Sequence, residues 1–294
     1  MRQKIIDKIF NLMESDERIF FLTADMGINL VEKFEEKFPK RYLNVGIAEQ
    51  NLIGICSGLC KMGYLPFAYT ISNFIVHRCF EQIRNDISLH AYPITLMGTS
   101  AGFDNAPLGP THHIIDDWGM LKSLPGFQIY CPSSSDYALS LIPKIIQEKK
   151  PSYIRIPKGS YENLKTDDDF YYKKGDYKKT ILLSYSAPSQ ETLKVHQKTN
   201  VSFILFNKLH PLDEDLLISV LKNYKKIIVV EDHLKGNGLY SSICEMFFNY
   251  KSDQKIYSLS PKNFNLKVGI NPQYFHKEHK LDANSILEQI EKII

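Results

Sequence analysis

Residues 42–69 read YLNVGIAEQNLIGICSGLCKMGYLPFAY. A short apolar run at 42–45 is followed by a helix-type stretch at 47–62, and a second apolar run occupies 65–69. Apolar strands separated by helices are typical of βαβ units, whose parallel strands form a sheet covered by helices on both faces. This stretch therefore predicts an α/β fold.

The same alternation continues along the chain. In the first part we expect strands at 19–22, 42–45, 65–69, 94–97, 127–131 and 153–156, with helices at 28–37, 47–62, 73–89, 116–123 and 134–149. After a break rich in Gly, Asp, Tyr and Lys, we expect strands at 180–185, 201–206, 226–231 and 255–258, with helices at 189–196, 214–223, 239–250 and 283–294. The pattern predicts two consecutive parallel-sheet αβα domains, residues 1–160 and 179–294, joined by a linker at 161–178.

Composition narrows the class of protein. Of 294 residues, 44% are hydrophobic and 23% charged, and the net charge is only +3, so nothing indicates nucleic acid or a membrane surface as a partner. The chain has no apolar run of about 18 residues, and its first residues lack the apolar core that is typical of a signal peptide. Its cysteines occupy positions 56, 60, 79, 131 and 244. Without a CxxC motif or a zinc-type ligand set, they are interpreted as buried thiols of a cytoplasmic protein, with no metal ligands in this chain.

Glu49 is the first candidate for chemistry. It opens the helix expected at 47–62, whose other residues are largely apolar or small, and a helix that is apolar all round is normally buried. Because burying an unpaired charge is costly, Glu49 is either paired or kept for catalysis. The alternative is a first-turn Glu that only complements the helix dipole.

Two further candidates for a functional site, a long loop and an aromatic residue, each follow the end of an expected strand. The loop at 98–117 is long and rich in Gly and Pro, and it carries adjacent histidines, His112 and His113, before two acids. Loops of this length are usually functional, and neighbouring side chains in an extended loop point in different directions, so we expect one histidine to face a site and the other to be structural. Alternatively, Asp116 caps a helix and the histidines are solvated. Phe74 begins the helix at 73–89, where it could stack on a flat ligand or simply belong to the core.

In this order, several segments resemble the transketolase family of thiamine-diphosphate enzymes. They are GIAEQNLIGICSGLCKMGYLPF (46–67), TISNFIVHRCFEQIRNDI (70–87), GPTHHIIDD (109–117), PSYIRIPKG (151–159), VSFILFNKLHPLD (201–213) and IIVVEDHLKGNGLYSS (227–242). The resemblance covers nearly the whole chain. It implies a thiamine-diphosphate pyrimidine-binding domain followed by a transketolase C-terminal domain.

The resemblance also implies roles in cofactor binding. In this family the glutamate of the GIAEQN-type motif hydrogen-bonds N1′ of the cofactor's aminopyrimidine and promotes loss of the thiazolium C2 proton; Glu49 matches it. A carboxyl group in an apolar site can carry the required proton near neutral pH. Phe74 matches the aromatic residue that stacks on the pyrimidine. Ile71 and His77 occupy positions where the family often has aromatic residues, so the pyrimidine site is similar but not identical.

Substrate binding is implied in the same way. His112 matches the active-site histidine near the cofactor amino group and the substrate, and Arg155 matches an arginine that holds the sugar phosphate, although it could instead pair with an acid at a strand end. Two positions depart from the family. Leu108 replaces an Asp that reads a substrate hydroxyl, and Ser100 replaces a substrate-binding His. These departures favour a deoxy, branched or otherwise specialised sugar.

One part of the family's active site is missing from the sequence. The diphosphate and Mg²⁺ are held in the family by a GDG…N motif in an N-terminal domain, whereas the only Gly-Asp here, Gly175-Asp176, lies in the expected linker. We therefore expect an N-terminal partner subunit to bring the diphosphate and metal ligands, in a dimer of heterodimers. Alone, this chain should bind thiamine diphosphate weakly.

The sequence thus predicts the C-terminal subunit of a split transketolase, which transfers a two-carbon ketol unit from a ketose, normally phosphorylated, to an aldose. Three alternatives stay open. The chain could be the beta subunit of a 2-oxo-acid dehydrogenase's decarboxylating component, a 1-deoxyxylulose-phosphate-synthase-like enzyme, or a non-catalytic protein that retains the fold.

Overall fold

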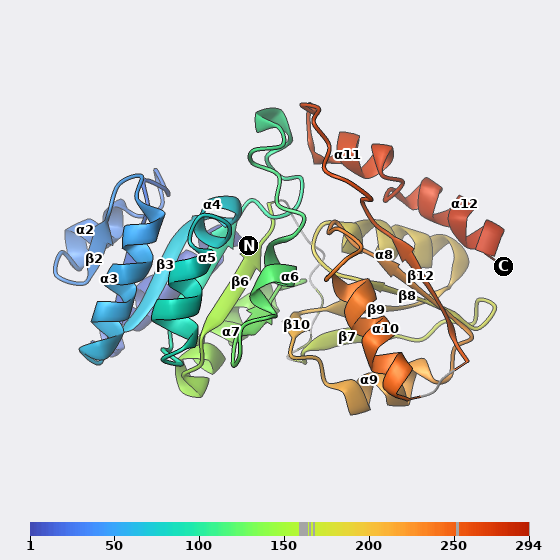
Figure 1. Ribbon diagram of the computed structural model, residues 1–294, viewed down its shortest axis with the longest axis horizontal. Coiled ribbons are helices and arrows are strands. Elements are labelled where there is room, and N and C mark those ends of the chain that lie inside the picture. The colour runs from blue at the N-terminus through green and yellow to red at the C-terminus, as the bar shows by residue number, and fades with distance from the viewer. Residues whose placement is uncertain (159–163, 165, 167, 251–252, 294) are drawn as a thin grey trace. The chain divides into compact units, whose positions relative to one another are not determined.

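The computed structural model describes residues 1–158, 164, 166, 168–250 and 253–293 (Figure 1). By their contacts, the residues form two compact units. The first unit comprises residues 1–100 and 121–167, and the second comprises residues 101–120 and 168–294.

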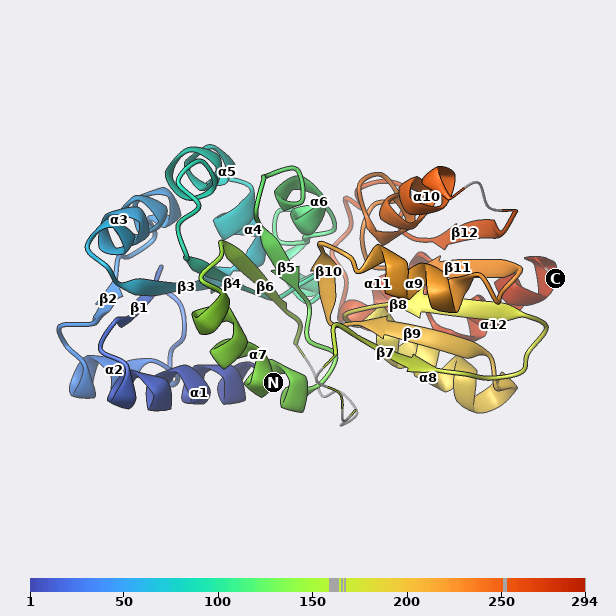
Figure 2. The ribbon, with the colours of Figure 1, turned by 90° about the horizontal axis from the view of Figure 1, so that it is seen from below.

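The first unit is built on a parallel sheet. Its strands are β1 (Ile19–Thr23), β2 (Tyr42–Asn44), β3 (Leu65–Ile71), β4 (Thr95–Thr99), β5 (Gln128–Tyr130) and β6 (Ser152–Ile156), in the order β5-β6-β4-β3-β1-β2. All described pairings among these strands are parallel. The helices are α1 (Arg2–Ser15), α2 (Glu32–Lys37), α3 (Glu49–Lys61), α4 (Ser72–Val76), α5 (Phe80–Gln82), a π-helix (Ile83–Ser88) and α7 (Ser135–Glu148). In Figure 2, α1, α2 and α7 cover one face, and α3, α4 and α5 cover the other.

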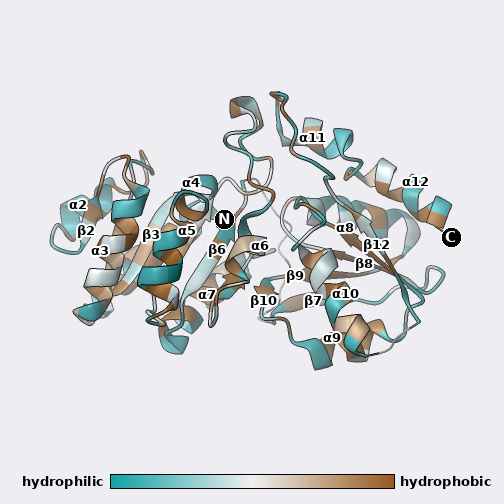
Figure 3. Cartoon of the chain, in the orientation of Figure 1, coloured by the Kyte–Doolittle hydropathy of each residue, from teal (hydrophilic) through white to brown (hydrophobic). Residues whose placement is uncertain are grey.

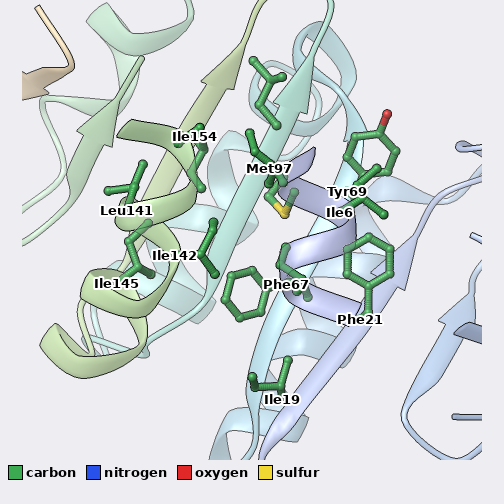
Figure 4. Close-up of a cluster of buried hydrophobic side chains, with 14 of the residues drawn as sticks. Ile6, Ile19, Phe21, Phe67, Tyr69, Met97, Leu141, Ile142, Ile145 and Ile154 are labelled. Carbon is green, nitrogen blue, oxygen red and sulfur yellow. The ribbon is translucent and has the colours of Figure 1, made fainter. Parts of the chain in front are cut away.

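The core of the first unit lies between its sheet and the helices α1 and α7. Side chains of β1, β3, β4 and β6 meet apolar residues of both helices, as Figure 4 shows. The helix α1 was not predicted, although Ile5, Ile9 and Met13 recur at helical spacing and are fully buried. These residues cover the sheet face that α7 alone would leave open.

The second unit contains another mainly parallel sheet. Its strands are β7 (Phe170–Lys173), β8 (Thr180–Ser184), β9 (Ser202–Phe206), β11 (Lys226–Val230) and β12 (Lys255–Leu259), in the order β12-β11-β8-β9-β7, and a short strand β10 covers Lys208–His210. Its helices are α8 (Pro188–Thr199), α9 (Glu214–Leu221), α10 (Leu239–Asn249), α11 (Pro272–Glu278) and α12 (Ala283–Ile293), and α6 (Asp117–Leu121) begins in it. The helices alternate between hydrophilic and hydrophobic residues along their length (Figure 3), as expected for helices that cover a sheet.

The α/β class and the parallel sheets are confirmed, but three local expectations differ from the structure. The stretch expected to be a linker at 161–178 includes β7, which pairs antiparallel with β9; residues 161–163, 165 and 167 lie outside the described part. The segment 101–120 clusters with the second unit. The single helix expected at 73–89 is broken into α4, α5 and the π-helix, with a turn at 77–79. The turn carries Arg78, which contacts Glu49 of α3, and helical periodicity cannot reveal such a contact.

Among the described residues, no helix is both long and apolar enough to cross a membrane.

Gly98 of β4 permits the start of α4 to approach the sheet. A Cβ atom added there would lie 2.6 Å from Ser72 Oγ and 2.8 Å from the Tyr153 hydroxyl. We predict that Gly98→Ala lowers the free energy of unfolding by about 1–3 kcal/mol, because overpacking forces neighbours to shift. On α3, Gly58 has nothing within 4 Å of an added Cβ, so Gly58→Ala should instead stabilise the chain by about 0.5–1 kcal/mol. Urea unfolding measures both. Equal stabilities for the two variants would contradict this packing.

Candidate active site

Glu49 is a buried carboxylate at the first residue of α3. It is only 3% exposed, and the preceding residue, Ala48, provides no side-chain cap for the helix. The expectation that this helix is buried all round was wrong. Gly54 and Gly58 lie on an exposed face, and Ile47, just before the helix, is 78% exposed. Burial is therefore concentrated on the face that carries Glu49, because the opposite face has small residues with little apolar area to bury.

Arg78 is the partner of Glu49. Its Nη1 atom donates a hydrogen bond to Glu49 Oε2 at 2.8 Å, and its guanidinium carbon lies 4.3 Å from the centroid of the Phe74 ring. Gln50 Nε2 also donates to the Arg78 carbonyl at 2.8 Å, which ties the turn at 77–79 to the start of α3. Sequence reasoning missed Arg78 because its neighbours in the chain give no sign of the contact.

The other pyrimidine-site candidates lie on one short segment after β3. Ile71 ends β3, Phe74 is half-buried on α4, and His77 follows the last residue of α4. The His77 Nδ1 atom is hydrogen-bonded to Asn73 Oδ1. The structure thus brings Glu49 and Phe74 together through Arg78 and places Ile71 and His77 on the segment that carries Phe74.

Two expected substrate residues lie at or beyond neighbouring strands of the first sheet. Ser100 follows β4, is 2% exposed and has φ of 65°, a left-handed conformation uncommon for a residue with a side chain. Such strained backbone is often found at functional sites. Arg155 lies within β6, beside Gly98 in the sheet register, and has no exposed surface. A direct contact between Arg155 and a sugar phosphate therefore requires a rearrangement around the guanidinium.

The loop that carries the histidines belongs to the second unit. His112 is half-buried, and its Nδ1 atom lies 3.0 Å from Thr111 Oγ1. Leu108, at the end of a short 3₁₀ turn, is 56% exposed. Because a leucine side chain has no hydrogen-bonding atom, this position offers a ligand only apolar contact.

The neighbouring histidine, His113, has a structural environment. Its ring contacts Phe275 of α11, with centroids 4.6 Å apart, and Phe103 at 5.3 Å. Phe103 also stacks on Phe275 at 5.0 Å and on His279 at 5.2 Å. The loop with His112 is thus packed against α11 through aromatic rings, and this contact was not predicted because its two sides lie far apart in the sequence.

A buried hydrogen-bond chain holds the end of the same segment. Trp118 Nε1 donates to the Tyr185 hydroxyl at 2.9 Å, and that hydroxyl donates to Glu231 Oε2 at 3.1 Å. The Leu239 amide at the start of α10 donates to the same oxygen at 2.8 Å. Burial raises the pKa of Glu231 to about 7, against the opposing effect of these hydrogen bonds. These contacts explain why residues 101–120 cluster with the second unit.

The side chains around Glu49 fit an aminopyrimidine but not a metal ion. Within the described ranges, no group of at least three His, Cys, Asp or Glu residues could hold a metal ion. Beside Glu49, burial raises the pKa of the Cys79 thiol to about 12, reinforced by the Glu49 charge, so this thiol stays protonated. Glu49 and Phe74 already receive a planar N–H donor, the Arg78 guanidinium, by hydrogen bonding and stacking. An aminopyrimidine needs the same two interactions.

Comparison with known proteins identifies the family. The model for the transketolase pyrimidine-binding domain matches residues 1–163. The chain belongs to the transketolase family. Thiamine diphosphate is the cofactor that this domain type implies.

Its relatives include both split and long chains. The chain is 27% identical over 271 residues to one of the subunits of an apulose-4-phosphate transketolase from Actinobacillus succinogenes, with 88% of this chain and 86% of the relative covered. A putative transketolase C-terminal section from Methanocaldococcus jannaschii is 25% identical, with 99% and 95% covered. The 1-deoxy-D-xylulose-5-phosphate synthase of Halothermothrix orenii is 27% identical over 96% of this chain, which spans only 46% of that protein.

Solved structures share the fold. A structure described as a split gene transketolase, inactive beta4 tetramer, superposes with a TM-score of 0.85 at 22% identity, covering 99% of this chain and 96% of the other. The transketolase of Campylobacter jejuni gives a TM-score of 0.79 at 14% identity, covering 99% of this chain and 46% of the other.

We predict that acid loosens the packing of the loop at 101–116 on α11. Burial lowers the pKa values of His113, His276 and His279 below the ordinary 6.5, because it disfavours the charged imidazolium. A pKa lowered by folding contributes stability that is present above the unfolded value and is lost as pH falls through the folded one. The contribution of these three histidines to the free energy of unfolding should therefore drop as pH is lowered below about 6.5, whereas Glu231, whose pKa is raised to about 7, contributes in the opposite direction.

Unfolding of the intact chain between pH 7.5 and pH 5, with hydrogen exchange at 101–116, checks this prediction. Relative to the wild type, His276→Phe should lose less stability between pH 7.5 and pH 5, whereas His90→Gln, at an exposed position of the first unit, should follow the wild-type profile. Hydrogen exchange in the wild-type loop that does not rise on acidification would contradict the prediction, whatever the stability of the variants.

Proposed function

We propose that this chain is the C-terminal subunit of a split transketolase, which transfers a two-carbon ketol unit from a phosphorylated ketose to an aldose acceptor with thiamine diphosphate. The observation that carries the proposal is the buried Glu49 carboxylate, 3% exposed, which shares a planar cationic partner with the half-buried Phe74 ring. A carboxylate is retained in such a place only when it is paired or used.

The proposed roles in cofactor binding are those of the family residues that these positions match. Glu49 binds N1′ of the aminopyrimidine and holds a proton there, Phe74 stacks on the ring, and Ile71 and His77 line it. When bound, thiamine diphosphate supplies the carbanion stabilisation that ketol transfer needs. The buried surroundings of Glu49 strengthen its hydrogen bond to the ring by excluding water.

The substrate roles rest on the remaining candidates. His112 is proposed to act near the cofactor amino group and the sugar, Ser100 to contact the substrate, and Arg155 to hold the sugar phosphate. The exposed Leu108 cannot hydrogen-bond a sugar hydroxyl, which favours a deoxy, branched or otherwise specialised sugar. The name of the Actinobacillus relative, which is that of an apulose-4-phosphate transketolase, supports a phosphorylated ketose as donor.

A partner subunit completes the proposed site. Mg²⁺ and the diphosphate would be held by an N-terminal subunit with a GDG…N motif, in a dimer of heterodimers in the cytoplasm. Support comes from two relatives that are named as a subunit and as a C-terminal section. Ile47, two residues before Glu49 and 78% exposed, is an apolar side chain that such a partner would cover.

The second candidate function is that of a 1-deoxyxylulose-phosphate-synthase-like enzyme, which the 27% identity to the Halothermothrix protein favours. Such an enzyme, like the decarboxylating component of a 2-oxo-acid dehydrogenase, releases CO₂ from pyruvate. Release of CO₂ by the reconstituted pair would therefore replace the ketol-transfer proposal.

We predict that the purified chain has no ketol-transfer activity alone and gains it when an N-terminal subunit with a GDG…N motif is added with thiamine diphosphate and Mg²⁺. A panel of ordinary, deoxy and branched ketose phosphates, tested with ribose 5-phosphate as acceptor, measures the activity. Transfer by the chain alone would remove the need for the partner. Ordinary efficiency with xylulose 5-phosphate would contradict the specialised-sugar part of the proposal.

We predict that Glu49→Gln lowers kcat of the reconstituted pair by about 100-fold or more, because an amide cannot hold the proton at N1′. Glu81→Gln, an exposed carboxylate on α5, is the matched control and should keep wild-type activity. Circular dichroism and melting curves verify that both variants are folded. A folded Glu49→Gln protein with near wild-type kcat would refute the assigned role.

A further inference from the structure

The contacts of Arg78 extend the proposed function, on which this inference rests. Its guanidinium donates to Glu49 Oε2 at 2.8 Å and lies 4.3 Å from the Phe74 ring centroid. These are the two groups that the aminopyrimidine of the cofactor is proposed to use. One side chain of the protein therefore takes both interactions.

The Arg78 guanidinium and the aminopyrimidine of the cofactor have similar chemistry. A guanidinium is planar, delocalised and cationic, donates N–H bonds to a carboxylate and stacks on aromatic faces. A protonated aminopyrimidine is also flat, conjugated through its ring nitrogen and amino group, and an N–H donor to the same carboxylate. We propose that Arg78 is a resident substitute for the aminopyrimidine, which holds Glu49 and Phe74 in the cofactor-free chain and leaves when thiamine diphosphate binds.

The surroundings of Arg78 allow such a displacement. Its side chain is 43% exposed, whereas that of Glu49 is 3% exposed, so the guanidinium has access to solvent and the carboxylate does not. The backbone of Arg78 is held separately, by the hydrogen bond from Gln50 Nε2 to its carbonyl at 2.8 Å. The side chain can therefore rotate outward without moving the turn at 77–79.

The occupation of the site by Arg78 stabilises the cofactor-free chain but weakens cofactor binding. Without Arg78, the buried Glu49 carboxylate of the cofactor-free chain would have no cationic partner at this contact, and an unpaired buried charge is strongly destabilising. With Arg78 in place, the apparent affinity for the cofactor is reduced by the fraction of molecules in which the site is open. Arg78 thus acts on cofactor affinity and on stability in opposite directions.

The opposite effects of Arg78 on cofactor affinity and on stability provide the test. In the full chain, Arg78→Met keeps the length of the apolar stem and removes the donor and the charge. We expect its affinity for thiamine diphosphate with Mg²⁺, measured by isothermal titration calorimetry on the pair reconstituted with the N-terminal subunit, to rise about tenfold or more. Its melting temperature without cofactor should fall by about 4 °C or more. The matched control is Arg84→Met on the π-helix, where Arg84 bonds to Asn85 at 2.7 Å; neither quantity should change.

Each other outcome overturns the inference. If Arg78 only stabilises the fold, Arg78→Met should have a lower melting temperature and should bind thiamine diphosphate as tightly as the wild type or more weakly. Absence of binding by the Arg78→Met pair, under conditions in which the wild-type pair binds, also contradicts it, because the variant is expected to bind more tightly than the wild type. The proposed function is judged separately, by turnover of the reconstituted pair and its loss in Glu49→Gln. An active pair with unchanged affinity in Arg78→Met would refute only the role of Arg78.

Discussion

The ion pair between Glu49 and Arg78 is the constraint on which the first unit's site depends. A carboxylate with 3% exposure needs a partner, and its partner comes from 29 residues along the chain, beyond the next strand. To present that partner, the helix after β3 stops at Val76 and the chain turns before α5 begins. The same turn brings the guanidinium over Phe74. The break in the helix thus places Arg78 between the two pyrimidine-site candidates.

The candidate residues are supported by two separate cores. Glu49, Phe74 and their segment rest on the first sheet, where the absence of a side chain at Gly98 lets α4 begin close to β4. The loop with His112 rests on the second unit, through ring contacts with α11 and the buried chain from Trp118 to Glu231. Proton-dependent groups occur in this second core, because burial shifts the pKa of Glu231 upward and those of three histidines downward. The packing that supports the loop with His112 therefore depends on pH.

The sequence predicted the α/β class and most elements, because buried parallel strands are apolar throughout and alternate with helices of ordinary length. It also identified Glu49 as a buried charge. It could not identify Arg78, since a contact across 29 residues leaves no periodic trace. The helix α1 escaped prediction although its apolar spacing was present, and β7 was hidden by the charged residues around it. The exposed glycines of α3 show that an apolar composition does not ensure burial on every face when side-chain area is small.

The packing of Phe103 and His113 on α11 has a practical consequence for shortening the gene. A chain that stops before residue 272 would retain every candidate site residue and both sheets, yet it would lose Phe275, His276 and His279. The rings of Phe103 and His113 would then be exposed to solvent, and the loop with His112 would lose the side chains it packs against. Expression boundaries for this protein should therefore be chosen by the needs of the loop at 101–116, more than 150 residues upstream, as well as by the end of the last strand.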